Sequence, residues 1–189
     1  MKNLKTIAIA LLVAVSTTAV TAQTKKVDVS KSKINWVGKK VTGEHSGTVN
    51  LKDGLLIFQG KKLKGGTFTV DMNSISATDI NADQGKDKLD GHLKADDFFG
   101  TAKYPTSKLV FKTIAAKAND VYTVTADLTI KDKTNPVTFD ITVKGNTATT
   151  AFAIDRTKYD IKYGSGSFFD GLGDKTINDN FDVTVSLQF

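Results

Sequence analysis

The chain has 189 residues with a formal net charge of +6, and 40% of its residues are hydrophobic. It contains no cysteine, which excludes disulfide bonds and thiol chemistry. Every basic residue except Arg156 is lysine, whereas a nucleic-acid-binding face would combine arginine with aromatic side chains, so we expect no nucleic-acid partner.

The start of the chain has the pattern of a cleavable signal peptide. Two lysines precede a nearly unbroken apolar run over residues 7–15, and small residues follow it. The run is too short to span a bilayer, and no cysteine follows that could carry a lipid anchor. We expect residues 1–22 to be removed, and residues 23–189 to form a single domain that is periplasmic or secreted. A buried N-terminal helix is the alternative, which is disfavoured because no other segment is apolar on all sides.

Most of the remaining chain alternates between apolar and polar residues, which is the period of a half-buried β-strand. In one such segment Phe68, Val70 and Met72 share a face, and threonine or aspartate occupies the other. Asp53-Gly54 has the composition of a tight turn between two segments. Strands are expected at residues 32–40, 47–52, 55–58, 67–72, 108–114, 122–130, 137–143, 149–154 and 181–189.

These segments predict an all-β fold, an antiparallel sheet with one apolar and one polar face. A closed barrel gives the apolar faces a common interior and leaves no free edge. A two-sheet sandwich satisfies the same alternation, and periodicity does not distinguish the two. The single helical segment and the many aromatic residues on the apolar face favour an eight-stranded antiparallel barrel, with one short helical insert capping one end.

The alternation stops in one insert, which ends at Pro105. Leu89, His92 and Leu93 share one face of a predicted helix. Asp96-Asp97 then suits the start of a further turn, where carboxylates meet free N–H groups. Two phenylalanines follow before the proline ends the helical stretch. We expect this insert to close the barrel as a plug or lid.

Four segments together resemble the YceI-like family. They are His92-Leu93-Lys94 with Phe98-Phe99 and Tyr104-Pro105, residues 128–138, residues 155–161, and Glu44-His45-Ser46-Gly47. The likeness runs from about Val27 to Phe189, in the family's order. It implies an exported, lipocalin-like barrel, and some members hold a polyisoprenoid chain, such as a polyprenyl or quinone-type tail, in the apolar interior. The resemblance therefore implies a lipid-binding protein.

A prenyl chain offers no charge and no hydrogen bond, so its affinity must come from buried carbon, at ~0.8 kcal/mol per methylene. Such a site needs a long apolar tube. Ligand-binding residues are expected on the inward faces and on the insert: Trp36, Phe68, Met72, His92, Phe98, Phe99, Phe111, Leu128, Phe139, Phe152 and Phe181. The alternative is that these side chains fill a closed core, and that the protein is a non-enzymatic stress-related or interaction module.

The sequence shows no motif for catalysis or metal binding. His45 and His92 are the only histidines, and neither belongs to a closely spaced ligand motif. We expect His92 to bond a backbone carbonyl or a carboxylate such as Asp90 or Asp96. Arg156 is expected to pair with a carboxylate or to cap carbonyls. A protein without enzymatic activity is therefore expected, with no metal and no cofactor other than a bound lipid.

An amphiphilic lipid is the expected partner, and membrane contact is expected to be transient at most. Residues 163–167 are rich in glycine and serine and are expected to form a mobile loop. The sequence leaves both a monomer and a homodimer open.

Overall fold

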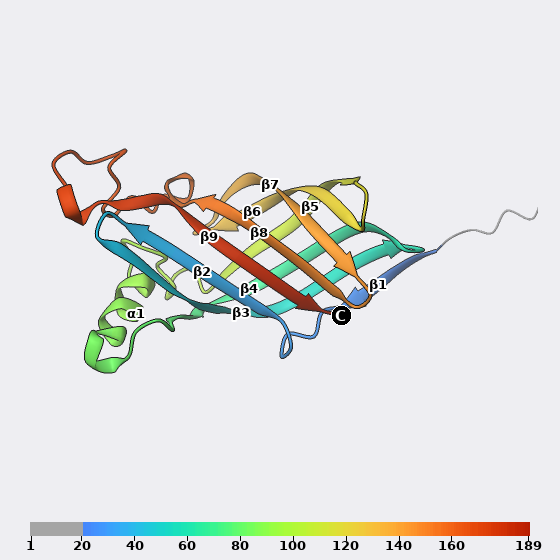
Figure 1. The fold of residues 1–189 in the computed structure, drawn as a ribbon, viewed down its shortest axis with the longest axis horizontal. Coiled ribbons are helices and arrows are strands. Elements are labelled where there is room, and N and C mark those ends of the chain that lie inside the picture. Colours follow the sequence, from blue (N-terminus) through green and yellow to red (C-terminus); the bar gives the residue numbers. More distant parts are fainter. Residues whose placement is uncertain (1–20) are drawn as a thin grey trace, which may run out of the picture.

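A computed structural model describes residues 21–189, and most of this stretch is β-strand (Figure 1). Residues 1–20, which make up most of the expected signal peptide, lie outside the described residues, so that expectation stays a prediction. The strands are β1 (Ala22–Lys26), β2 (Lys33–Lys40), β3 (Gly43–Gln59), β4 (Lys62–Ala77), β5 (Thr106–Ala116), β6 (Val121–Ile130), β7 (Lys133–Lys144), β8 (Thr147–Asp155) and β9 (Ile177–Gln188). The helices are α1 (Lys86–Lys94) and the short 3₁₀ helices η1 (Ala82–Gln84), η2 (Arg156–Tyr159) and η3 (Gly173–Lys175).

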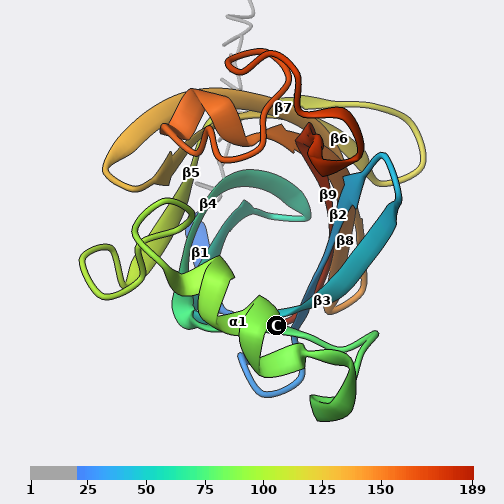
Figure 2. The same ribbon diagram turned by 90° about the vertical axis from the view of Figure 1, so that its left-hand side faces the viewer.

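The eight strands from β2 to β9 close into a barrel. Each pairs antiparallel with the next along the chain, and β9 returns to pair with β2. Figure 2 shows the closed ring of strands end-on. The predicted eight-stranded antiparallel barrel is therefore confirmed, and the sandwich is excluded.

A ninth strand, β1, is not predicted by the alternation. It pairs with the second half of β3, from Ala22 opposite Gln59 to Lys26 opposite Leu55. Just after β1, the backbone N–H of Asp28 donates to the carbonyl of Gln188 at the end of β9, at 2.7 Å. The start of the described chain thus lies at the end of the barrel opposite α1 (Figure 1).

β3 is one continuous strand of 17 residues, so the predicted turn at Asp53-Gly54 is wrong. The pairing with β4 shifts register between Leu51 and Asp53, which indicates a bulge within the strand. Glycine is required at position 54 because a Cβ there would lie only 2.9 Å from the ring of Phe68. The turn comes later, at Gly60, whose φ of 60° suits a residue without a side chain.

The segment between β4 and β5, residues 78–105, contains the predicted insert and is called the cap below. It is attached to the barrel through α1, which packs against the end of β4. The carboxylate of Asp90 accepts hydrogen bonds from the Ser76 hydroxyl and from the Ala77 N–H, both at 2.7 Å. Lys86 donates to the same carboxylate at 2.8 Å and to the Ala77 carbonyl at 2.6 Å, and it also contacts Ser76. These four residues are called the α1 clamp below.

A second attachment holds the residues that follow α1. Lys131, in the turn between β6 and β7, donates to the backbone carbonyls of Asp96 and Phe98 at 3.0 and 2.9 Å. The cap therefore lies at one end of the barrel, as predicted, and Figure 2 shows α1 along the lower side of the ring of strands. Neither α1 nor any other helix within residues 21–189 has the length and apolar composition needed to cross a membrane.

Candidate functional site

The side chains inside the barrel form two apolar clusters, and a cavity is lined by both. One cluster includes Ile34 and Phe139, and the other, nearer the cap, includes Trp36 and Phe99. The cavity has a volume of about 180 Å³. A cavity needs only about 10–15 Å³ to hold one water molecule, so this space is much larger than a packing defect. The interior of the barrel is therefore not packed shut.

Residues near the middle of the strands show the cavity most clearly. Four of them pack against both clusters and also line the cavity: Val49, Val70, Leu109 and Phe152. Each is only half-buried, although its place in the strand alternation turns it inward. The surface that these side chains retain therefore faces the cavity.

A series of phenylalanine rings forms one part of the wall. The ring centroids of Phe68 and Phe111 are 5.5 Å apart, and those of Phe111 and Phe139 are 6.0 Å apart. Phe139 stacks on Phe152 at 4.5 Å, with 13° between the ring planes. Aromatic pairs with such geometry contribute about 0.5–1.5 kcal/mol beyond their burial. The rings thus hold one another in a fixed, apolar surface.

The cap supplies another part of the wall. Leu93 of α1 is buried and faces the cavity, and Phe98 and Phe99 follow it. The centroids of Phe98 and Phe99 are 5.2 Å apart, and Phe99 meets Phe181 of β9 edge to face at 6.2 Å. Because these side chains belong to the cap, any displacement of the cap changes the shape of the cavity.

Arg156 is the only charged residue among the described residues that line the cavity. Its guanidinium donates, at 2.8–3.0 Å, to the backbone carbonyls of Ile161, Tyr163, Ile177 and Asn178. Asp179 lies 3.6 Å from it. Burial lowers the pKa of Arg156, and the carboxylate of Asp179 opposes that effect. The prediction that Arg156 caps carbonyls is confirmed, and its N–H groups are directed at protein atoms.

The other polar groups of the wall are few. The hydroxyl of Thr150 and the indole N–H of Trp36 each donate to a backbone carbonyl, at 2.7 and 3.2 Å. Ser107 and Asn178 contribute the remaining polar side chains of the described wall. A molecule in this cavity would therefore be held mainly by contact between carbon atoms.

Ten of the eleven residues predicted to bind a ligand line the cavity: Trp36, Phe68, Met72, Phe98, Phe99, Phe111, Leu128, Phe139, Phe152 and Phe181. His92 does not line it. Its ring packs against those of Phe98, at 5.5 Å, and Tyr163, at 4.4 Å, beside the cap. The ten residues thus share one cavity, and their role in binding stays a prediction.

The carboxylate beside His92 is Asp97, whose Oδ2 lies 3.7 Å from Nε2, so the predicted partners Asp90 and Asp96 are wrong. Asp90 belongs to the α1 clamp, and Asp96 pairs with a lysine at 2.7 Å. For Asp90 the reason is helical geometry, because residues two apart on a helix do not face each other. Asp96 is four residues from His92, but α1 ends at Lys94, so the helical spacing does not extend to it.

The sequence prediction missed much of the aliphatic wall. The additional apolar residues are Ile34, Val49, Leu51, Val70, Ile75, Leu93, Leu109, Ile130, Ile141, Ile154, Ile177, Val183, Val185 and Leu187. Most occupy the same inward strand positions as the predicted aromatic residues, so the alternation itself would identify them. Gly38 also lines the cavity, and no residue pattern could have indicated a wall position that lacks a side chain.

The two histidines have separate partners. His45 Nδ1 lies 2.9 Å from the carboxylate of Asp79, and His45 does not line the cavity. Within residues 21–189, no group of three or more histidine, aspartate or glutamate side chains is arranged to hold a metal ion.

Residues 163–167 are anchored to β9, contrary to the mobile loop predicted from their composition. Ser165 is fully buried and forms a bridge with Ile177. The Ile177 N–H donates to the Gly164 carbonyl at 2.8 Å. Serine and glycine suit this segment because the backbone approaches the start of β9 closely.

The sequence is similar to a known protein family and to several curated sequences. The YceI-like domain family matches residues 26–189. A UPF0312 protein from Shewanella denitrificans is 36% identical over 92 residues, which are 49% of this chain and 46% of that protein. Protein YceI of Escherichia coli is 34% identical over 87 residues, which are 42% and 45% of the two chains. The chain thus spans about half the length of the curated relatives it matches.

Solved structures share the fold. BcnA from Burkholderia cenocepacia is similar with a TM-score of 0.68 and 26% identity, over 85% of this chain and 98% of that one. A polyisoprenoid binding domain from Saccharophagus degradans, implicated in plant cell wall breakdown, has a TM-score of 0.59 and 15% identity, over 86% and 95%. The second likeness concerns the fold alone. With a match that extends over nearly all the described residues, the chain belongs to the YceI-like family.

Proposed function

We propose that the protein binds an isoprenoid-like amphiphile, with a polyprenyl or quinone-type tail, inside its barrel. The observation that carries the proposal is the apolar cavity lined by both clusters, with aromatic rings in its wall and Leu93, Phe98 and Phe99 of the cap beside it. A relative of similar fold described as a polyisoprenoid binding domain adds support.

The chemistry of the wall favours recognition of the tail. Each buried methylene is worth ~0.8 kcal/mol, and most of the wall is carbon. Four of the five N–H groups of Arg156 donate to backbone carbonyls, and Asp179 lies 3.6 Å from Nη2, so little of the guanidinium is left to select a charged head group. The affinity should therefore depend on tail length more than on the head group.

We propose that the protein acts by binding and not by catalysis. Among the described residues of the wall, the hydroxyls are those of Ser107 and Thr150, and no histidine accompanies them as a base. The alternative of an interaction module with a closed core requires side chains in contact throughout the interior, and the cavity argues against it.

We further propose that the protein is exported and works in the periplasm or outside the cell. The support is the sequence of residues 1–22, with its two lysines and its apolar run. N-terminal sequencing of protein recovered from its own host checks this proposal, and the expected first residue is Gln23. The mass of the intact protein in solution distinguishes a monomer from the homodimer that the sequence leaves open.

Extraction with organic solvent, followed by mass spectrometry, tests the binding proposal on protein purified from its own host. Recovery of an isoprenoid lipid in proportion to the protein is the expected result. Repeated recovery of no lipid, combined with no uptake of added prenyl compounds, would contradict the proposal.

A further inference from the structure

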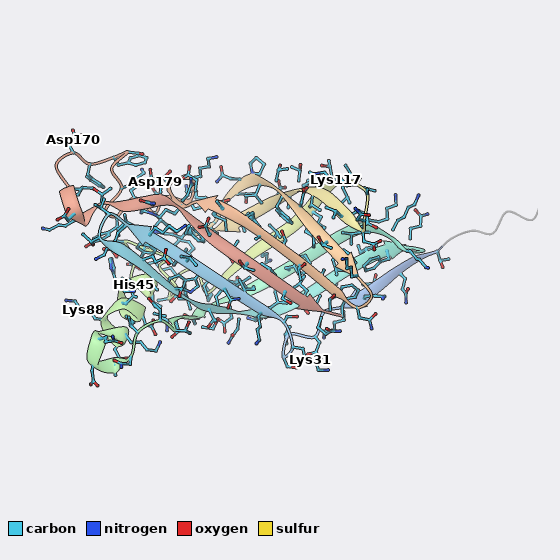
Figure 3. The ribbon with its side chains drawn as sticks, in the orientation of Figure 1. Lys31, His45, Lys88, Lys117, Asp170 and Asp179 are labelled. Atoms are coloured by element: carbon cyan, nitrogen blue, oxygen red, sulfur yellow. The ribbon has the colours of Figure 1, made fainter. Side chains whose placement is uncertain are left out.

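A group of exposed aromatic side chains stands at the capped end of the barrel. Tyr163, Phe168 and Phe169 are 47%, 49% and 51% exposed. They belong to residues 162–176, between η2 and β9, which we call the rim segment. Figure 3 places Asp170 at the tip of this segment, projecting beyond the strands and far from Lys117 at the other end of the barrel. Two adjacent phenylalanines exposed at a projecting tip indicate a surface for interaction.

The rim segment is firmly held at its base. Arg156 donates to the carbonyls of Tyr163 and Ile177, near the two ends of the segment. The backbone N–H groups of Phe168 and Phe169 both donate to the carbonyl of the buried Ser165, at 3.2 and 3.0 Å. The two aromatic rings are therefore presented by an anchored turn.

The same segment borders the cavity. Ile177 and Asn178, which directly follow it, line the cavity, and so does Arg156. At the start of the segment, Tyr163 packs against His92 of α1 at 4.4 Å. The exposed rings thus lie on a segment that joins the cap to the wall of the cavity.

The charge of the rim segment identifies the kind of surface it fits. Its two lysines, at 162 and 175, balance Asp170 and Asp174. The ammonium of Lys162 lies over the ring of Phe168, 4.9 Å from its centroid, and its carbon stem can follow the ring into an apolar layer while the charge stays in water. Aromatic rings flanked by lysine, without net charge, suit the interface of a lipid bilayer.

We propose that the rim segment docks the protein on a lipid bilayer, with Phe168 and Phe169 inserted between the head groups and the acyl chains. The inference rests on the proposed function, because a long prenyl tail is too insoluble to reach the cavity through water. Docking at this segment would bring the border of the cavity to the membrane, so that a tail passes directly between bilayer and barrel.

Flotation with phosphatidylcholine vesicles tests the docking. Replacing both rings, Phe168→Ser with Phe169→Ser, should weaken vesicle binding about tenfold or more, because two half-exposed phenylalanines no longer enter the bilayer. The matched control is Leu55→Ser with Ile57→Ser, since these side chains are 36% and 37% exposed on β3, where it pairs with β1. The control should bind vesicles as the unaltered protein does.

A second measurement separates docking from ligand binding. A soluble short-chain ubiquinone should quench the fluorescence of Trp36, which lines the cavity, equally in the unaltered protein and in both double variants. Failure of the unaltered protein to bind this quinone would count against the proposed function. Equal binding of the quinone, together with undiminished vesicle binding by the Phe168→Ser, Phe169→Ser protein, would overturn the docking proposal alone.

Discussion

Gly38 provides open space in the wall of the cavity where the neighbouring strand positions carry large side chains. It lies in β2, opposite Phe181 of β9, and lines the cavity. No atom lies within 4 Å of the place where its Cβ would be. A larger residue here can extend into the cavity without displacing the strands.

We predict that Gly38→Leu weakens binding of a prenyl quinone about tenfold, because the new side chain displaces roughly two methylenes of the ligand. Isothermal titration calorimetry measures the affinity. Gly91→Leu is the control, because Gly91 lies on an exposed position of α1 and also has no atom within 4 Å of its would-be Cβ. Equal affinities for the two variants would show that the ligand does not occupy this part of the cavity.

Arg156 holds the backbone after η2 against the start of β9, because its guanidinium donates to carbonyls of both segments. We predict that Arg156→Met lowers the free energy of unfolding by about 2–4 kcal/mol, because four buried or half-buried carbonyls lose their donor. Arg156→Lys should restore only part of it, since lysine has fewer donors and no planar fork. Urea denaturation measures the change. A variant of full stability that no longer binds ligand would instead identify Arg156 as a head-group contact.

At the scale of the elements, alternation predicted most strands because each has one face in the apolar interior. β3 was mispredicted because Asp53-Gly54 has the local composition of a turn, while close approach to the Phe68 ring, a tertiary contact, is what requires the glycine. The cavity could not be predicted for a related reason. Alternation indicates which side chains point inward, but whether Phe111 meets Phe139 or an open space depends on the radius of the closed barrel.

The α1 clamp makes the attachment of the cap sensitive to acid. Burial raises the pKa of Asp90, but hydrogen bonds from Lys86, the Ala77 N–H and Ser76 together lower the pKa by more than burial raises it. The pKa of Asp90 therefore lies below its ordinary value. A carboxyl whose pKa falls on folding stabilises the folded state above its unfolded pKa of about 3.9, and that stabilisation is lost as the pH falls through the folded value.

We therefore predict that the amide hydrogens of α1 exchange faster, relative to their intrinsic rates, as the pH drops below about 4. Asp90→Asn should loosen α1 at neutral pH, by about 1–3 kcal/mol, and should remove most of the acid dependence. Hydrogen exchange followed by mass spectrometry of the α1 peptide gives both quantities. Asp87→Asn, on the exposed face of the same helix, should change both much less, since it removes only the interaction of a first-turn carboxylate with the helix N-terminus; an equal effect of both substitutions would contradict the clamp.

At the scale of the whole molecule, the interior of the barrel consists of two apolar clusters. Val49 and Leu109 pack against both clusters but are only partly buried. A bound tail would contact both and complete one continuous core. We predict that a prenyl quinone at a concentration 100 times its Kd stabilises the protein by about 2.7 kcal/mol, seen as a higher Tm in calorimetry. No increase in Tm under saturating conditions would mean that the ligand does not bind the folded protein in preference to the unfolded chain, which contradicts a site inside the barrel.

The fluorescence of Trp36, the single tryptophan, reports on the cavity it lines. Titration with a short-chain ubiquinone should quench this fluorescence to saturation at one quinone per chain, and Gly38→Leu should shift the curve to higher concentration. Fluorescence that stays unquenched, or quenching that never saturates and is the same in both proteins, would contradict a ligand inside the barrel.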